Sequence, residues 1–270
     1  MNPFPSLAGI ALSFCLVAVS AWAQPGASEN VTGKETKATG RTMKLMTYNI
    51  LHGAGMDGRW NLWRTADVIR RAAPDVACLQ EVEVKSSRSF CADEPKMLAY
   101  LLNPKIRFSR FSKSIDFGGG EYGNAMISAE EPISTKVVPL PGGEPRSFLL
   151  CEFKDYYVGT AHLALLENEC LESVPIIVEA IREAKKPIFI TGDWNVQPDS
   201  PVIEAIKKHF VILSDPAVCT WSAREPQVCI DYIAVDKAHA DKVKVHSVEV
   251  LDEREASDHR PIVLSFELLP

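Results

Sequence analysis

Short apolar runs alternate with polar turn sequences along most of the chain, and this pattern predicts a fold built mainly from strands. The run Pro187-Ile188-Phe189-Ile190 is typical of a buried strand that ends at a polar turn. Many runs are separated by only a few residues, which indicates direct connections between strands. The predicted strands are 43–49, 75–81, 123–128, 134–140, 147–153, 156–162, 187–192, 229–235, 243–250 and 261–268.

Apolar residues at helical spacing predict helices between the strand clusters. The ranges 61–73, 95–102 and 172–185 show this spacing, and in the first of them Leu62 and Ile69 fall on one face. That range ends before a proline, which cannot continue a helix. Helices separated by clusters of strands favour packed sheets with helices outside, a mixed α/β (α+β) sandwich, over a strictly alternating barrel.

An apolar stretch near the amino terminus, Leu7–Ala23, closes with the small-residue pattern Ala21-Trp22-Ala23. This pattern is typical of a signal peptide, so we expect residues 1–23 to be cleaved and the protein to be secreted or periplasmic. The alternative is an uncleaved anchor, because no Lys or Arg precedes the stretch, but its length lies at the short limit of the roughly 17–25 residues that span a bilayer. Residues 24–41 predict a flexible leader, and one domain then spans 42–270.

The composition is that of an ordinary globular protein, with 46% hydrophobic and 24% charged residues. The net charge of −6 argues against a non-catalytic nucleic-acid-binding module, because such modules usually present a basic surface. A nuclease that binds phosphates through metal ions does not need a basic surface, so the charge excludes a nuclease much less strongly.

The cysteine count fits an oxidising compartment. Seven cysteines minus Cys15, which lies in the predicted signal peptide, leave an even number, six. Cys219 and Cys229 flank a turn-like segment and are the first candidates for a disulfide, whereas Cys78 and Cys151 lie in apolar runs and are equally typical of core residues. No C-x-x-C pair is present, which argues against a structural zinc site.

Ionisable and amide side chains gather where the predicted strands end. Asn49 ends the first strand, Glu81 ends the second, and Asp258 precedes the last. A carboxylate at the end of a buried strand is costly unless it is paired or binds a cation. Carboxylate and amide oxygens are hard ligands, so we expect these residues to bind Mg²⁺, Mn²⁺ or Ca²⁺. Taken alone, Glu81 would more often be a surface residue.

The string Gly192-Asp193-Trp194-Asn195 follows another buried strand. Asp193 offers a base or a ligand, and Asn195 places a neutral amide beside it. Such a pair can orient a water molecule at phosphorus. On its own, the string also fits an ordinary turn from strand to loop, where Gly, Asp and Asn are frequent.

Two histidines occupy positions suited to chemistry. We expect a hydrogen bond between Asp231 and His259, which would fix the imidazole and favour its charged form. His162 ends a predicted strand, where it can donate to a phosphate oxygen or protonate a leaving group. His52 follows the first strand, and its role stays open.

A series of short strings resembles the endonuclease/exonuclease/phosphatase superfamily, which shares the fold of deoxyribonuclease I. The strings are TYN, LQEVE, YGNAMIS, GTAHL, ITGDWNVQPDSP, IDYI and SDHRPI, and they cover residues 43–268 in the family's order. The resemblance implies a four-layer sandwich in which helices flank two packed mixed β-sheets. It also implies a Mg²⁺-dependent phosphoesterase site along one edge.

The same resemblance implies roles for individual residues. Tyr122 and Asn124 in YGNA, and Arg146 in a GE-x-R turn, would line the cleft that binds the substrate phosphate. The other implied roles agree with those reached above from residue chemistry: Asn49, Glu81 and Asp258 in the metal site, and His162, Asp193, Asn195, Asp231 and His259 in catalysis.

The sequence leaves the substrate open. Our first hypothesis is a secreted metal-dependent phosphodiesterase that acts as a nuclease; the others are a phospholipase C or sphingomyelinase-like hydrolase of lipid head groups, and a catalytically silent binding protein of the same fold. Apolar loops beside the cleft would favour lipid, and a basic groove, for which Arg107, Arg110 and Lys113 are the nearest candidates, would favour nucleic acid. Gln197 and Pro198 replace the arginine that follows GD-x-N in inositol phosphatases, which disfavours that branch. We expect a monomer with no obligate protein partner.

Overall fold

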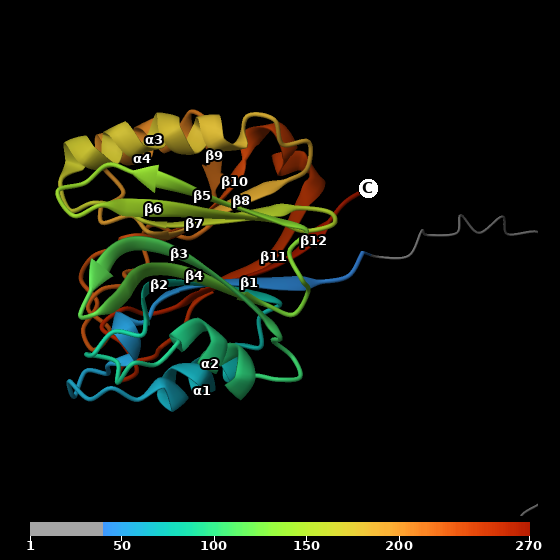
Figure 1. Cartoon of the computed structure of the whole chain (residues 1–270). Helices are drawn as coiled ribbons and strands as arrows, with labels where there is room; N and C mark the ends of the chain where they lie inside the picture. The colour runs from blue at the N-terminus through green and yellow to red at the C-terminus, as the bar shows by residue number, and fades with distance from the viewer. Residues whose placement is uncertain (1–39) are drawn as a thin grey trace, which may run out of the picture. The chain divides into compact units, whose positions relative to one another are not determined.

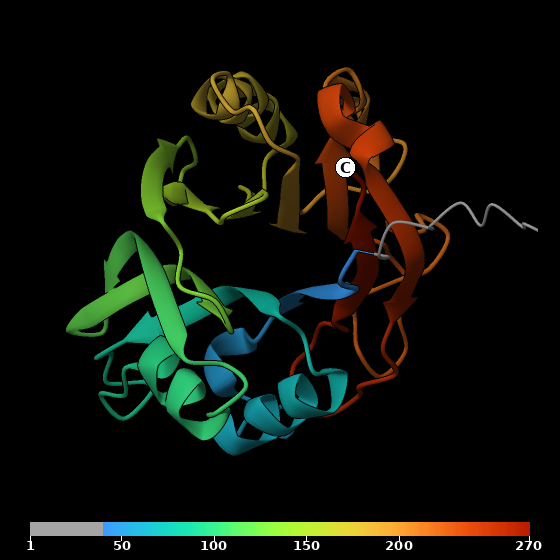
Figure 2. The same ribbon diagram turned by 90° about the vertical axis from the view of Figure 1, so that its right-hand side faces the viewer.

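Two mixed β-sheets lie face to face in the structure, a computed structural model that describes residues 40–270 as one compact unit. The predicted signal peptide, residues 1–23, and the predicted leader as far as Thr39 lie outside the described residues. Figure 1 shows the sheets stacked between two layers of helices, and the end-on view in Figure 2 shows the same layers.

The first sheet is built around two parallel strands, β1 (Met43–Asn49) and β2 (Val76–Val84). Asn49 lies opposite Gln80 in their register, so Glu81 of β2 follows just beyond the end of β1. The other neighbours in this sheet pair antiparallel. The strand order is β11 (Val243–Val250), β12 (Ile262–Leu268), β1, β2, β4 (Gly120–Ser128) and β3 (Phe108–Phe117).

The second sheet repeats this plan around the parallel strands β7 (Tyr157–His162) and β8 (Ile188–Asp193). Here His162 lies opposite Asp193, at a shared edge. The remaining pairs are antiparallel. The strand order is β5 (Ser134–Leu140), β6 (Arg146–Glu152), β7, β8, β10 (Asp231–Asp236) and β9 (Phe210–Ile212).

Helices cover the outer face of each sheet (Figure 1). Side-chain caps start two of them: the Asp93 carboxylate accepts from the Lys96 N–H at 3.3 Å, and the Ser200 hydroxyl accepts from the Val202 N–H at 3.1 Å. Within residues 40–270, no helix has the length and apolar character needed to cross a bilayer. The helices are α1 (Leu62–Ala72), α2 (Glu94–Leu101), α3 (Glu167–Ile181) and α4 (Pro201–Lys207), and two short 3₁₀ turns are η1 (Leu51–Gly53) and η2 (Lys237–Lys242).

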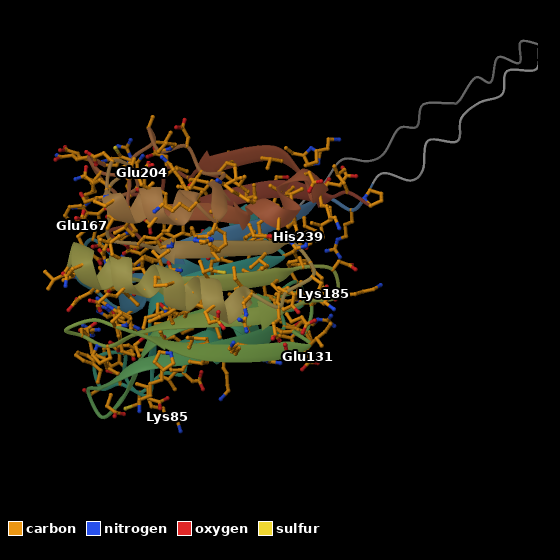
Figure 3. All side chains as sticks on the ribbon, turned by 90° about the horizontal axis from the view of Figure 1, so that it is seen from above. Lys85, Glu131, Glu167, Lys185, Glu204 and His239 are labelled. Atoms are coloured by element: carbon orange, nitrogen blue, oxygen red, sulfur yellow. The ribbon has the colours of Figure 1, made fainter. Side chains whose placement is uncertain are left out.

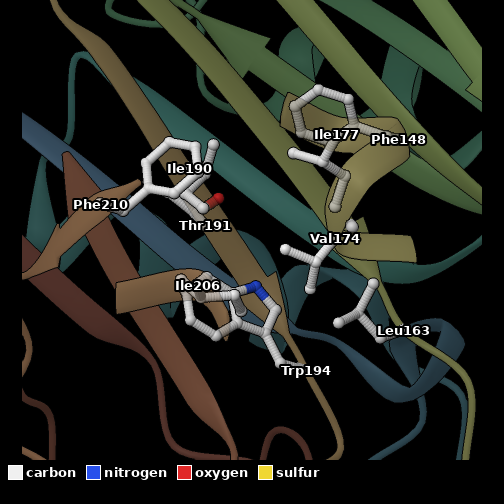
Figure 4. Close-up of a pocket in the computed structure, with 10 residues that line it drawn as sticks. Phe148, Leu163, Val174, Ile177, Ile190, Thr191, Trp194, Ile206 and Phe210 are labelled. Atoms are coloured by element: carbon white, nitrogen blue, oxygen red, sulfur yellow. The ribbon is translucent and has the colours of Figure 1, made fainter. Parts of the chain in front are cut away.

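Hydrophobic layers fill the space between the sheets and under each pair of helices. Between the sheets, Phe189 and Phe266 pack with ring centroids 4.5 Å apart; burying such a ring contributes roughly 1.5–3 kcal/mol. Under α3 and α4, a cavity of about 10 Å³ is lined by apolar side chains such as Val174, Trp194 and Ile206 (Figure 4). This volume admits at most one water molecule, so the cavity is a packing void and no ligand site.

The predicted sandwich of two mixed sheets with outer helices is confirmed, and the differences lie at its margins. The sequence pattern does not predict β3, β9 or α4. β3 is a half-buried edge strand whose serines and charges obscure the apolar alternation, and β9 has only three residues. α3 begins at Glu167 and not at 172, because Glu167 and Glu169 form a first turn where acidic side chains favour a helix start.

The six cysteines within residues 40–270 are free thiols. Cys78 and Cys151 are fully buried between the sheets, as their apolar surroundings indicate. Cys219 is partly buried and Cys229 is buried, and no bond joins them. The disulfide expected between them is therefore not present in the structure.

Candidate active site

The carboxyl ends of β1, β2, β7 and β8 meet at one end of the sandwich. Asn49, His162 and Asp193 are the last residues of β1, β7 and β8. β10 runs antiparallel to β8, so its first residue, Asp231, lies opposite Asp193. The segment before β12 brings His259 to the same end. In Figure 3, Glu167 at the start of α3 marks this end, and Lys185 and His239 mark the opposite one.

Asn49 connects the two sheets. Its fully buried side chain donates through Nδ2 to Glu81 Oε1 at 3.1 Å and to Asp193 Oδ2 at 3.0 Å. Its Oδ1 accepts from the Leu51 N–H at 3.1 Å, and the Ser257 hydroxyl donates to its backbone carbonyl at 2.7 Å. The sequence predicts that the Asn49 oxygen faces a metal ion, but this arrangement turns its N–H group toward the carboxylates. Asn49 therefore aligns two acids from different sheets.

Glu81 lies at a bulge in β2, where the pairing with β4 shifts register. Its φ of 56° falls in the left-handed region, which is uncommon for a residue other than glycine. Burial raises the pKa of Glu81, the hydrogen bond from Asn49 lowers it, and the negative charges of Asp258 and Asp193 raise it again. Three carboxylates thus repel one another in a small volume.

Asp258 accepts hydrogen bonds from two neighbours. Trp221 Nε1 donates to its Oδ2 at 3.2 Å, and the Ser257 hydroxyl lies 3.4 Å from its Oδ1. Trp221 is 42% exposed, so its ring forms part of the rim of the site. Sequence reasoning missed both neighbours. Ser257 belongs to the SDH string, which could have pointed to it. Trp221 is not a polar residue at the end of a predicted strand, so the sequence pattern does not indicate its role.

His259 lies between two carboxylates. Its Nδ1 is 2.8 Å from Asp231 Oδ2, and its Nε2 is 3.5 Å from Asp193 Oδ2. Burial lowers the pKa of His259, but Asp231 and Asp193 outweigh burial and raise it to about 10. The ring is therefore positively charged at neutral pH, and the structure contains the expected pair of Asp231 and His259.

His162 has the opposite character. Its Nε2 lies 3.4 Å from Asp193 Oδ2, while its buried Nδ1 has no partner. Burial lowers the pKa of His162 to about 4 although Asp193 raises it. The ring is neutral at pH 7, which suits a hydrogen-bond donor better than a general acid.

The string from Gly192 to Asn195 turns sharply at the end of β8. Gly192 has a φ of 140°, and a Cβ added there would lie 1.8 Å from the Ala161 carbonyl oxygen, so only glycine fits. The Asn195 N–H donates to Asp193 Oδ1 at 3.0 Å, and its Nδ2 donates to the Leu163 carbonyl at 2.9 Å. These bonds fix Asn195 beside Asp193, as the sequence analysis expects.

Tyr122, Asn124 and Arg146 border the site from β4 and β6. Burial raises the pKa of Tyr122, and the charge of Glu81 raises it further, so the phenol is close to that carboxylate. Asn124 donates to the Ser147 carbonyl at 2.9 Å, and its buried Oδ1 has no partner. Arg146 is 7% exposed, and its Nε atom is also unpaired. These unpaired polar atoms fit a cleft that takes a polar substrate group.

Arg107, Arg110 and Lys113, the candidates for a basic groove, do not form one beside the site. Arg110 and Lys113 lie on β3, where Arg110 pairs with Glu131 at 3.4 Å and Lys113 is bound by acidic neighbours. Arg107 donates to the Ala129 carbonyl, beyond the far end of β4. Pairing with acids neutralises the charge of two of them, and Arg107 points to the wrong end of the sandwich.

Two sets of side chains have the atoms to hold a cation. The ligand atoms of Asp193, Asp231 and His259 all lie within 4.8 Å of one another. In that set, the charged ring of His259 binds Asp231 Oδ2, while the buried Oδ1 of Asp231 has no partner. The set expected from the sequence consists of the carboxylates of Glu81 and Asp258, with Asn49 beside them.

Comparison with known proteins gives the family. The sequence model of the Endonuclease/Exonuclease/phosphatase family matches residues 46–259. The chain belongs to this family. Membership confirms the resemblance seen in the sequence and supports hydrolysis of a phosphoester bond as the class of activity. No curated protein matches the chain.

Solved structures share the fold of this chain. The endonuclease/exonuclease/phosphatase from Beutenbergia cavernae is 25% identical and superimposes with a TM-score of 0.73, over 85% of this chain and 72% of that one. A mannosyl-6-phosphatase from Bacteroides thetaiotaomicron is 16% identical, with a TM-score of 0.67 over 83% of this chain and 99% of that one. D. rerio TDP2, solved with a single strand DNA product, is 18% identical, with a TM-score of 0.63 over 84% of this chain and 99% of that one. The last two show a common fold alone.

Proposed function

We propose that the protein is a secreted, divalent-metal-dependent phosphodiesterase that cleaves nucleic acid. One observation carries the proposal: Asp193 Oδ2 lies within 3.0 Å of Asn49 Nδ2, 3.4 Å of His162 Nε2 and 3.5 Å of His259 Nε2. A carboxylate held in place by these groups can take a proton from a water molecule. Family membership supports phosphoester hydrolysis, and the ion, the diester substrate and secretion are the added parts of the proposal.

The ion site consists of the carboxylates of Glu81 and Asp258, which Asn49 helps to align. These are hard oxygen donors, and burial with mutual repulsion raises the pKa of Glu81. A divalent cation offsets that repulsion, so the residues fit Mg²⁺ or Mn²⁺, with Ca²⁺ as the third choice. When bound, the ion polarises a phosphoryl oxygen and offsets the negative charge that develops at phosphorus.

Asp193 and the side chains around it carry out the remaining steps of the reaction. Asp193 and Asn195 orient a water molecule, and Asp193 takes its proton as the water oxygen bonds to phosphorus. The bond from phosphorus to the ester oxygen breaks, and the leaving oxygen takes up a proton from solvent. His259, kept positively charged by Asp231, donates to a phosphate oxygen and stabilises the developing charge. Neutral His162 donates a second hydrogen bond to the phosphate.

Two observations support nucleic acid as the substrate. Arg146 lies buried at the border of the site, where it pairs with Glu144 at 2.9 Å, and Lys85 is exposed on the connection that follows β2. Positive side chains placed beyond the scissile bond suit a substrate whose phosphates continue along a backbone. D. rerio TDP2, which shares the fold, was solved with a single strand DNA product, so nucleic acid is the first substrate to test.

A lipid head group is the second candidate, and one observation favours it. Leu165 and Leu166 are 76% and 59% exposed on the connection between β7 and α3, shortly after His162. Exposed leucines beside a catalytic cleft fit a substrate that is presented at an apolar surface.

A substrate panel tests the proposal. DNA, RNA, sphingomyelin, a phosphoinositide and a sugar phosphate are each incubated with the purified protein and either Mg²⁺ or Mn²⁺. We expect release of product from DNA or RNA. Turnover of sphingomyelin without turnover of nucleic acid would replace the substrate by a lipid. No turnover with any substrate and ion would contradict the proposal and favour a catalytically silent binding protein.

Secretion rests on the apolar stretch Leu7–Ala23 and its closing Ala21-Trp22-Ala23. Mass spectrometry of the protein purified from a secreting host checks it. We expect a mature chain that begins at Gln24 and is found outside the cytoplasm. A chain that keeps Met1 would contradict cleavage.

A further inference from the structure

A buried carboxylate outside the site, Glu94, joins the two chain segments that carry Asn49 and Glu81. It is the first residue of α2, and its side chain is fully buried. Its Oε2 accepts from the backbone N–H of Glu83 at 2.8 Å, and its Oε1 accepts from Trp60 Nε1 at 3.0 Å. Each oxygen therefore binds a different segment of the chain.

The first hydrogen bond fixes β2 just after Glu81. The left-handed backbone of Glu81 is strained for a residue other than glycine, and such strain persists only where the surroundings hold it. Glu83 follows two residues later, with both its backbone N–H bound by Glu94 and its Oε1 bound by Arg88 Nε at 2.7 Å. Glu94 thus holds the strand on the exit side of the bulge.

The second hydrogen bond reaches the turn that follows Asn49. The Trp60 ring packs on this turn so closely that a Cβ added to Gly53 would lie 3.0 Å from Nε1. The turn begins with Leu51, whose N–H holds the Asn49 side-chain oxygen at 3.1 Å. Through Trp60, Glu94 therefore also supports the amide that aligns the acids.

Keeping this carboxylate buried has an energetic cost. Burial raises the pKa of Glu94 to about 7, although the hydrogen bonds from Trp60 and Glu83 lower it. An apolar side chain would pack without that cost. Only a carboxylate, however, offers two acceptor oxygens and no donor to a pair of N–H groups. The chemistry of this position therefore matches its two partners.

We propose that Glu94 is a positioning residue that holds Glu81 and Asn49 in the geometry that binds the divalent cation. It acts through the backbone of Glu83 and the indole of Trp60, and it touches neither ion nor substrate. The inference rests on the proposed function, because it assigns Glu94 a part in forming the proposed ion site.

Calorimetric titration of the mature chain with Mn²⁺ tests the inference independently of turnover. Glu94→Gln keeps the size of the side chain but turns an NH₂ group toward one of the two donors. We expect the Mn²⁺ affinity to fall about tenfold or more, as it does when supporting partners of metal ligands are lost. The rate at saturating Mn²⁺ should recover most of the wild-type value. Trp60→Phe keeps a ring, removes one donor and should show a smaller loss of affinity in the same direction.

Asp236→Asn is the matched control. Asp236 is another buried carboxylate that accepts from a backbone N–H, that of Ile188 at 2.8 Å, and its partner His239 lies at the opposite end of the sandwich (Figure 3). We expect Asp236→Asn to lower the melting temperature and leave the Mn²⁺ affinity unchanged.

The outcomes separate the inference from the proposed function. Wild-type Mn²⁺ affinity in both Glu94→Gln and Trp60→Phe overturns the inference alone. An equal loss of affinity in Asp236→Asn also overturns it, because lost stability would then explain the effect. A wild-type chain that binds no Mn²⁺ overturns the proposed function and the inference with it. If Glu94→Gln does not fold, the Mn²⁺ affinity of Trp60→Phe is compared with that of Asp236→Asn. A loss of affinity in Trp60→Phe alone supports the inference, and no difference between the two overturns it.

Discussion

The Nε2 atom of His259 lies 3.5 Å from Oδ2 of Asp193, while Nδ1 of the same ring lies 2.8 Å from Oδ2 of Asp231. One imidazole is thus held between two buried carboxylates that come from β8 and β10. The carboxylates keep the ring positively charged against the effect of burial. A fixed positive donor beside a base is the feature on which the proposed chemistry depends.

His259→Ala should reduce the rate of phosphodiester hydrolysis by more than roughly 10²-fold, because it removes a charged donor to the phosphate. Steady-state rates at saturating Mg²⁺ measure the loss. His239→Ala is the matched control, since His239 pairs through Nδ1 with Asp236 at 2.7 Å at the other end of β10. Equal rates in the two variants would refute a role for His259.

Asp193→Asn should lower the rate of turnover by roughly 10²–10⁴-fold, because an amide cannot take the proton from water. The fold should persist, since the side chain keeps its size, and circular dichroism checks this point. Asp199→Asn changes an exposed carboxylate in the connection that follows β8 and should leave the rate unchanged. A near-normal rate in Asp193→Asn would rule out its action as the base.

The free energy of unfolding should fall as the pH drops from about 6.5 to about 4, in part because of His162. Its pKa is lowered from 6.5 to about 4 in the folded chain, so over this range the unfolded chain binds the extra proton. Urea unfolding in the presence of a chelator measures the effect at several pH values. His162→Gln should lose less stability than the wild type over this range. If the free energy of unfolding falls equally with pH in both proteins, the buried ring is not neutral.

Gly192→Ala should lower the free energy of unfolding by more than about 3 kcal/mol, because the new Cβ would meet the Ala161 carbonyl oxygen at 1.8 Å. Gly119→Ala provides the control, since Gly119 also has a positive φ, 80°, but open space around its Cβ position. That change should cost only about 1–2 kcal/mol. Similar losses in both variants would show that backbone strain alone, without the clash, explains the requirement for glycine.

The local pattern of the sequence predicts the residues whose signal lies within their own strand. Glu81 and Asp193 end apolar runs, where a carboxylate is costly unless it is paired or binds a cation. The orientation of Asn49 could not be predicted, because its amide is turned by the Leu51 N–H on one side and by Asp193 from the other sheet.

Residues that act through distant partners leave no such signal. Trp221 reaches Asp258 from a connection 37 residues earlier in the chain, and Glu94 reaches Trp60 across 34 residues. Their spacing in the sequence carries no periodicity, so only the fold reveals them. β3 escaped prediction for a related reason: an edge strand buries one face weakly, and its alternation is diluted by serine and charge.

The most direct test of the account is the rate of phosphodiester hydrolysis during removal and return of the divalent ion. Purified wild-type protein is assayed with a phosphodiester reporter, treated with a chelator, and then supplied with increasing free Mg²⁺ or Mn²⁺. We predict that chelation abolishes the rate and that added ion restores it along a saturating curve. A rate that is unaffected by chelation would contradict the assignment of Glu81, Asp258 and Asn49 to an ion site.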